Sequence, residues 1–166
     1  MTALPLGASV TGAGRGSIKV NWYYGSGTPD QMMRSPADFS GAWEAMIGSS
    51  TFRMPAPSAL RMWIEHKGAD IVHRVLTVGA DGIERRAELR YVVGQRVEAQ
   101  IGGQAAFVSA RWEGETLVIE SEVGPPERRL QLSDHWSISD DGATLTMAHP
   151  DDILAGQVCI LRRMAQ

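Results

Sequence analysis

The sequence has few of the features that mark disulfide-stabilised, zinc-binding or membrane-spanning proteins. Among its 166 residues there is one cysteine, Cys159, which excludes an internal disulfide framework and any zinc site built from several cysteines. No stretch approaches about 18 consecutive apolar residues, and the N-terminus lacks a basic start followed by an apolar core. We therefore expect no membrane span and no signal peptide, and we expect a cytoplasmic protein.

Basic charge is also scarce. The 16 Lys and Arg residues are outnumbered by 19 Asp and Glu residues, which gives a formal net charge of −3. Such a chain has no broad basic surface for a phosphate backbone, so nucleic acid is not an expected partner. The hydrophobic content of 43% is ordinary for a soluble globular domain with a substantial core.

Motifs of common enzyme classes are missing as well. There is no Gly-x-Ser-x-Gly nucleophile motif and no P-loop, and the glycine-rich residues 12–16 lack a strand-turn-helix context. We expect no metal site and no cofactor, because the histidines form no short-spaced pair: His66, His73, His135 and His149.

The first 38 residues differ in composition from the rest of the chain. They are rich in glycine, serine and proline, and they contain one β-like run at 18–24 but no helical period. We predict a poorly ordered N-terminal arm over 1–38, followed by a β-barrel domain over 39–166. A misassigned start codon upstream of Met32 and Met33 and a genuine flexible extension explain the arm equally well.

From Phe39 onward, short runs rich in Val, Ile, Leu, Trp and Thr alternate with turn signals such as Asp81-Gly82 and Gly102-Gly103. A flat sheet of that many strands would leave two edges exposed, whereas closure removes them. We therefore predict an all-β fold, a single antiparallel up-and-down β-barrel of about 8–10 strands. The long connection from Gly48 to Ala59 is expected to cap the barrel mouth. The predicted strands are 41–47, 60–67, 70–78, 83–93, 96–101, 104–112, 115–123, 127–138, 143–148 and 157–164.

Strand alternation predicts which side chains line the barrel. The strand at 70–78 allows two inward sets, one with His73 and one with Arg74. In the last strand, alternation favours Val158, Ile160 and Arg162 as inward residues and turns Cys159 outward. The expected ligand-binding apolar and aromatic positions are Met62, Ile64, Leu89, Tyr91, Ile119, Leu132 and Trp136.

Polar residues on these apolar faces need a physical reason, because a buried ion is costly unless it is paired or meets a ligand. They are Arg85, Asp134 and Arg162, with His66 and His73 as further candidates. We expect Arg85 or Arg162 to receive the carboxylate of an amphipathic ligand. An internal ion pair or a water-accessible place near the mouth also explains Arg85 and Asp134, and stacking on Trp43 also explains Arg162.

Two segments resemble a known family. Phe39-Ser40-Gly41-Ala42-Trp43 resembles the Gly-x-Trp signature of the lipocalins and the wider calycin superfamily, and Ile160-Leu161-Arg162-Arg163 resembles their last strand, where an arginine packs over that tryptophan. Residues 111–120 and 136–146 are similar to uncharacterised lipocalin-like bacterial proteins. The resemblance spans 39–164 and implies a cup-shaped barrel that holds a small apolar molecule, with Gly41 and Trp43 as structural residues. Ten strands are closer to the fatty-acid-binding proteins, although their helical lid after the first strand is missing here.

We therefore expect the barrel to bind a small hydrophobic or amphipathic molecule, such as one that bears a carboxylate. Two alternatives stay open. The first is a cofactor-independent cyclase or isomerase, with Asp134, His66, His73 or Tyr91 as the acid or base. The second is a filled barrel that acts as a protein-interaction module. Convergence of two titratable groups on one cavity would favour the enzyme.

Overall fold

The computed structural model describes residues 4–13, 17–25 and 36–165. The chain divides into two compact units, residues 1–35 and 36–166. In the first unit, β1 (Leu4–Ala13) and β2 (Ser17–Gly25) pair as an antiparallel hairpin. The β-like run at 18–24 lies within β2, whereas β1 was not predicted, because proline and glycine interrupt its alternation. The other parts of the predicted arm, 1–3, 14–16 and 26–35, lie outside the described residues.

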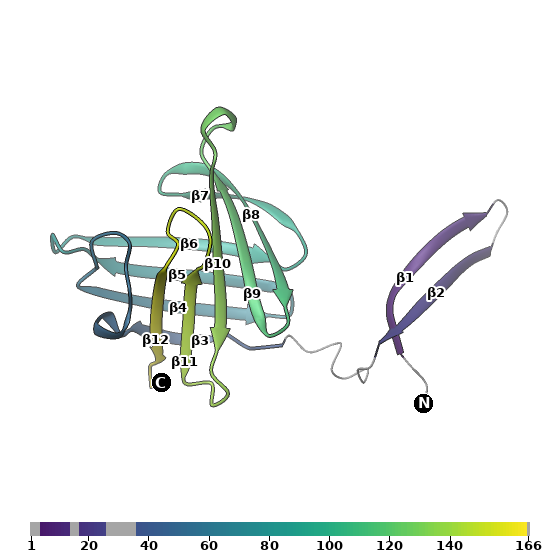
Figure 1. The fold of residues 1–166 in the computed structure, drawn as a ribbon, viewed down its shortest axis with the longest axis horizontal. Helices are drawn as coiled ribbons and strands as arrows, with labels where there is room; N and C mark the ends of the chain where they lie inside the picture. The colour runs from purple at the N-terminus through teal and green to yellow at the C-terminus, as the bar shows by residue number, and fades with distance from the viewer. Residues whose placement is uncertain (1–3, 14–16, 26–35, 166) are drawn as a thin grey trace. The chain divides into compact units, whose positions relative to one another are not determined.

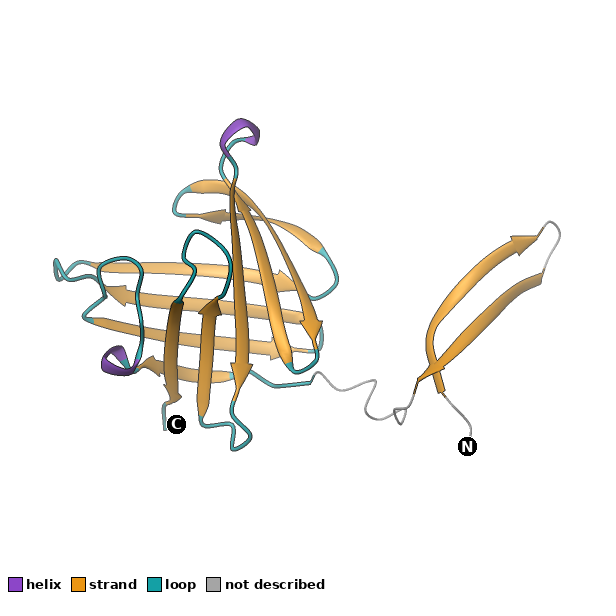
Figure 2. Ribbon diagram, viewed as in Figure 1, coloured by secondary structure: helices purple, strands orange, loops and turns teal. Residues whose placement is uncertain are grey.

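The second unit is one ten-stranded antiparallel sheet (Figures 1 and 2). Its hydrogen-bonded order is β6-β5-β4-β3-β12-β11-β10-β9-β8-β7, so strands adjacent in sequence pair, except β6 and β7, and β3 pairs with β12. This is the order of an up-and-down barrel, and it confirms the predicted all-β fold class. The strands are β3 (Gly41–Ala45), β4 (Ala59–Lys67), β5 (Asp70–Val78), β6 (Glu84–Val92), β7 (Arg96–Ile101), β8 (Gln104–Glu113), β9 (Thr116–Val123), β10 (Leu130–Ile138), β11 (Thr144–His149) and β12 (Gln157–Arg163).

The barrel is nearly closed. Strands β6 and β7 are the two ends of the sheet and share no ladder within the described residues. Their connecting turn is fixed at one end of the barrel, where Val93 N–H donates to Ala69 O and Gly94 N–H donates to Ala110 O, both at 2.8 Å. The sheet is thus tied together at that end, and the two edge strands separate away from it.

The connections alternate between the two ends of the barrel, because every strand reverses direction. At the end that we call the closed end, β4–β5, β6–β7 and β8–β9 are joined by tight turns with a positive-φ glycine, such as Gly68 and Gly114. The longest connections, 46–58, 124–129 and 150–156, all lie at the other end, which we call the mouth. They contain two short 3₁₀ helices, η1 (Ile47–Ser49) and η2 (Pro126–Arg128), visible in Figure 2.

The connection between β3 and β4 does not fold over the mouth along its whole length. Its first half continues β3 beside β12: Met46 N–H donates to Ile160 O at 2.7 Å, and Thr51 exchanges two hydrogen bonds with Val158. Helix η1 bulges between these two contacts, and the Ser50 hydroxyl donates to Met46 O at 2.8 Å. The expected cap is therefore reduced to the second half of the connection.

Trp43 fixes the packing at the closed end. Its side chain is fully buried, and its Nε1–H donates to Phe39 O at 2.9 Å. The guanidinium of Arg163 lies 4.2 Å from the centre of the indole and also donates to Gly142 O and Ser40 O. Gly41 allows this approach, because a Cβ there would lie 2.5 Å from Arg163 Nη1 and its φ is +137°. Arg163, and not Arg162, therefore closes the barrel over Trp43.

The inward placement predicted for Arg162 is wrong. Leu161 pairs with Ala45 and Arg163 with Trp43, which turns Cys159 and Leu161 into the core. The side chain of Arg162 is 66% exposed and donates to Glu44 Oε2 at 2.9 Å on the outer surface. Residues 158–161 are apolar on both faces, so alternation alone gives no direction, and pairing with β3 decides it.

Candidate functional site

The inner face of the barrel changes from buried to accessible along its length. Toward the closed end, inward side chains such as Ile71, Leu117 and Leu145 are fully buried. Closer to the mouth, inward side chains on β4, β5, β6 and β10 are partly exposed, namely Leu60, Val75, Leu89 and Leu132. On β8 and β9, inward residues such as Val108 and Val123 stay buried up to the mouth. The closed half of the interior is therefore filled by side chains, whereas β4, β5, β6 and β10 leave apolar surface uncovered in the mouth half.

Trp136 lies where these two halves meet. Its indole is fully buried and takes edge-on contacts from three rings, with centroid distances of 5.7 Å to Phe39, 5.0 Å to His73 and 5.9 Å to Tyr91. Phe39 approaches from the segment before β3, and the other two come from β5 and β6. The indole thus forms the floor of the accessible half.

Polar groups gather around this indole. His73 Nδ1 lies 3.3 Å from the hydroxyl of Tyr91, and both side chains are buried. On the other side, Trp136 Nε1–H donates to Asp134 Oδ2 at 2.8 Å. Three of the four predicted acid–base candidates, His73, Tyr91 and Asp134, therefore surround one side chain, although they come from three different strands.

Two further residues complete the polar cluster. His149, the last residue of β11, places Nδ1 2.7 Å from Asp152 Oδ2 and Nε2 3.9 Å from Asp134 Oδ1. Asp152 also accepts from the backbone N–H groups of Ser133 and Leu154, each at 2.7 Å. Asp152 is thus fixed by the backbone and holds His149 so that its other nitrogen faces Asp134.

This histidine–aspartate pair was not predicted as part of the site. His149 follows Leu145 and Met147 in steps of two, so the alternation that placed those residues inward was also the signal for His149. Asp152 left no comparable signal, because its position depends on the β11–β12 connection folding back against β10.

Burial controls the ionisation of the cluster. It lowers the pKa of His73 to about 4, so that the imidazole is neutral at pH 7. Burial, together with the charge of Asp134, raises the pKa of Tyr91, and burial also raises the pKa of Asp134 above its ordinary range. The site therefore disfavours charge on each of these groups.

Two atoms of the cluster have no hydrogen-bond partner among the described residues. They are His73 Nε2 and Asp134 Oδ1. Both atoms are shielded from solvent, although 23% of the Asp134 side chain is exposed elsewhere. Buried polar atoms are nearly always paired, so these two are the atoms that a ligand would be expected to satisfy.

His66, the fourth acid–base candidate, does not join the cluster. It pairs with Ile71, whereas His73 pairs with Ile64, so the two histidines are not opposite each other across the β4–β5 hairpin. The ring of His66 lies at the closed end, stacked near Phe39 at 5.9 Å and Trp112 at 6.2 Å. Its surroundings belong to the floor of the barrel and not to the accessible half.

Arg85 is in phase with Leu89 and Tyr91 on β6 but does not reach the interior. Its side chain is 58% exposed and forms an ion pair with Asp81 at 2.9 Å, near the mouth. The expected carboxylate site at Arg85 inside the barrel is therefore wrong, and so is the internal pair with Asp134; the water-accessible place near the mouth is what the structure shows. Alternation gives its phase correctly, but its height along the barrel depends on where the edge strand β6 begins at the mouth.

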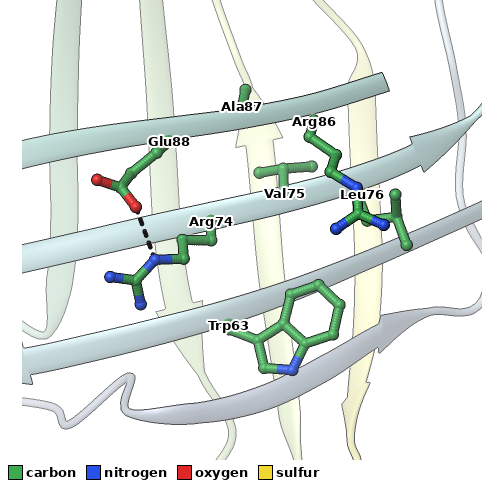
Figure 3. A pocket seen from close by; sticks show the side chains of 7 residues that line it. All are labelled: Trp63, Arg74, Val75, Leu76, Arg86, Ala87 and Glu88. Atoms are coloured by element: carbon green, nitrogen blue, oxygen red, sulfur yellow. Dashed lines mark hydrogen bonds and ion pairs between the residues drawn. The ribbon is translucent and has the colours of Figure 1, made fainter. Parts of the chain in front are cut away.

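Other arginines gather around a hollow on the outer face of β4, β5 and β6 (Figure 3). This hollow has a volume of about 310 Å³, and Trp63 and Leu76 form its apolar wall. Arg74 is held there by two carboxylates, Glu88 and Glu65, each at 2.6 Å. The hollow is separated from the interior by the sheet itself. Its full lining is Trp63, Arg74, Val75, Leu76, Arg86, Ala87 and Glu88.

In the part of the chain that the structure describes, no group of three or more His, Cys, Asp or Glu side chains is placed to hold a metal ion. None of the helices described there is long and apolar enough to span a bilayer.

Comparison with known proteins shows the fold. No protein-family model matches the chain, and no curated protein sequence matches it. Among solved structures, secretory abundant heat soluble protein 4 from Ramazzottius varieornatus is 13% identical with a TM-score of 0.58, covering 80% of this chain and 98% of that one. The wild-type fluorescent protein UnaG is 14% identical with a TM-score of 0.51, covering 76% and 97%. At such identities the likeness concerns the fold alone, a nearly closed barrel of ten antiparallel strands.

Proposed function

We propose that this protein binds a small hydrophobic or amphipathic molecule in the mouth half of its barrel. The observation that carries the proposal is the change in exposure along the inner face, from fully buried leucines to partly exposed Leu60, Val75 and Leu89. Covering apolar surface of this kind contributes about 25 cal/mol per Å². An apolar ligand body would gain that free energy by filling the space above Trp136.

The width of the barrel supports the same proposal. Eight-stranded barrels already enclose one small ligand, and the diameter grows with the number of strands. The large aromatic side chains of this ten-stranded barrel, Trp43, Phe39 and Trp136, are concentrated toward the closed end and away from the mouth. The likeness to other barrels supports the container shape and nothing finer, because fold does not determine function.

The enzyme alternative stays a prediction. His73 and Tyr91 do converge beside Trp136, which is the geometry that general acid–base chemistry needs. The interaction-module alternative required an interior filled along its whole length, and the partly exposed inner positions argue against it. The compartment and the similarity to bacterial lipocalin-like proteins also stay predictions.

Titration with Nile red, a neutral fluorophore that brightens in apolar surroundings, tests the proposal. We expect saturable binding of one molecule per chain. Leu60→Phe, which narrows the interior from β4, should weaken binding about tenfold, equivalent to ~1.4 kcal/mol. Leu76→Phe is the matched control, because Leu76 lies on the neighbouring strand β5 and lines the outer hollow.

Urea unfolding of both variants checks that they are folded before the titrations are compared. Equal weakening by the two substitutions would refute an interior site, and so would the absence of saturable binding to folded wild-type protein.

A further inference from the structure

We infer that the polar end of the ligand is a neutral hydrogen-bonding group such as an alcohol, seated between Asp134 and His149, and that it is not a carboxylate. The inference rests on the proposed function, since it names the chemistry of a ligand in the same interior. It replaces the carboxylate that the sequence led us to expect at Arg85 or Arg162.

The distance between Asp134 and His149 defines the seat. Asp134 Oδ1 is 3.9 Å from His149 Nε2, too far for a direct hydrogen bond, and Oδ1 has no other partner among the described residues. One oxygen atom placed between them can lie within about 2.8 Å of both. Asp152 occupies the Nδ1 edge of His149, which leaves Nε2 as the nitrogen available to a ligand.

The seat lies on the side of Trp136 that faces the mouth. Along β10, steps of two lead from buried Trp136 to Asp134 and then to partly exposed Leu132. His149 extends the β10–β11 ladder by one residue beyond the pair His135 and Ala148, which brings it opposite Asp134. A ligand with its head at this seat would lay its apolar body along the uncovered inner positions toward the mouth.

The charges around the seat oppose a carboxylate. Asp134 and Asp152 are both acidic, and the charge of Asp134 adds to the effect of burial in raising the pKa of Tyr91 and Cys159. No lysine or arginine is among the described groups that contact these side chains or shift their pKa values. The guanidiniums predicted to reach the interior are held outside it, by Asp81 and Glu44.

A cationic head is disfavoured for a different reason. Burial at the seat itself, which raises the pKa of Asp134, would also strip an ammonium group of its water. A hydroxyl both donates and accepts, so it can bridge Asp134 Oδ1 and His149 Nε2 when one proton is carried by either of these two atoms.

Displacement of Nile red by three molecules that share a ten-carbon chain tests the inference: 1-decanol, decanoate and decylamine at pH 7.5. We expect 1-decanol to bind about tenfold more tightly than either charged analogue. An alcohol also partitions into any apolar space more readily than an ion, so the preference must depend on the seat. Asp134→Asn removes the negative charge while keeping an oxygen toward Trp136, and it should reduce the preference for 1-decanol over decanoate about fivefold.

Asp140→Asn is the matched control, because Asp140 is exposed in the β10–β11 turn at the closed end. It should leave all three affinities unchanged. Decanoate or decylamine binding as tightly as 1-decanol would overturn the inference, and so would a preference that Asp134→Asn does not alter. Failure of Nile red itself to bind would instead overturn the proposed function, so the two failures are distinguishable.

Discussion

Replacing Arg163 with alanine tests the direction of β12 and the closure of the barrel. The substitution removes the contact with the Trp43 indole at 4.2 Å and the hydrogen bonds to Gly142 O at 2.8 Å and Ser40 O at 2.5 Å. A cation–π contact at an exposed site contributes about 0.5–1 kcal/mol. Charge-assisted hydrogen bonds, discounted because Arg163 is exposed, add roughly 0.5–1 kcal/mol each. We expect Arg163→Ala to lower the free energy of unfolding by about 2 kcal/mol.

Arg162→Ala, one residue away, is the control. Arg162 contacts Glu44 on the outer surface, and Glu44 keeps Arg61 at 3.3 Å when Arg162 is removed. Exposed ion pairs of this kind contribute little to stability, so Arg162→Ala should change the free energy of unfolding by no more than the error of the measurement. Urea unfolding followed by tryptophan fluorescence, with linear extrapolation, gives both values. A loss for Arg162→Ala as large as that for Arg163→Ala would refute the register of β12 described above.

Three further predictions concern the interior and the closed end. The pKa of His73 is about 4 in the folded protein and about 6.5 when unfolded, so the protein loses stability as the pH falls between these values. Between pH 7.0 and 4.5, the free energy of unfolding in urea should therefore fall less for His73→Gln than for wild type, and an equal fall in both would contradict this. Burial raises the pKa of Cys159 to about 11, so its reaction with a disulfide reagent should be slow in native protein and complete in urea; fast native reaction would mean that the thiol is exposed. Gly41→Ala should lower the free energy of unfolding by about 1–2 kcal/mol, because the new Cβ meets Arg163 Nη1. This loss should be smaller when Arg163 is also replaced by alanine, and an unchanged loss would disprove the clash.

The barrel could be predicted because its signals are local. Turn pairs such as Asp81-Gly82 and Gly102-Gly103 fall at the ends of strands, and positive φ at these glycines is what tight turns require. The orientation of β12 could not be predicted, since residues 158–161 are apolar on both faces. The exposure of Arg85 could not be predicted either, because it depends on where the edge strand β6 begins relative to the mouth.

Part of the site is visible in the sequence for one reason: a polar residue in phase with apolar neighbours. That pattern singles out Asp134 and His73, alternation places Tyr91 inward, and the same pattern applies to His149, which was not predicted as part of the site. Asp152 could not be found this way, because it lies in a connection, and its contact with His149 exists only when that connection folds back against β10.

The central claim is that the mouth half of the interior receives the ligand, and methyl NMR tests it most directly. Titration of methyl-labelled protein with 1-decanol should shift the signals of Leu60, Val75 and Leu89, at the uncovered inner positions. It should leave unchanged the signals of the fully buried leucines at the closed end, Leu117, Leu145 and Leu161. Shifts confined to Val75 and Leu76, which both line the outer hollow, or no shifts at saturating 1-decanol, would contradict the account.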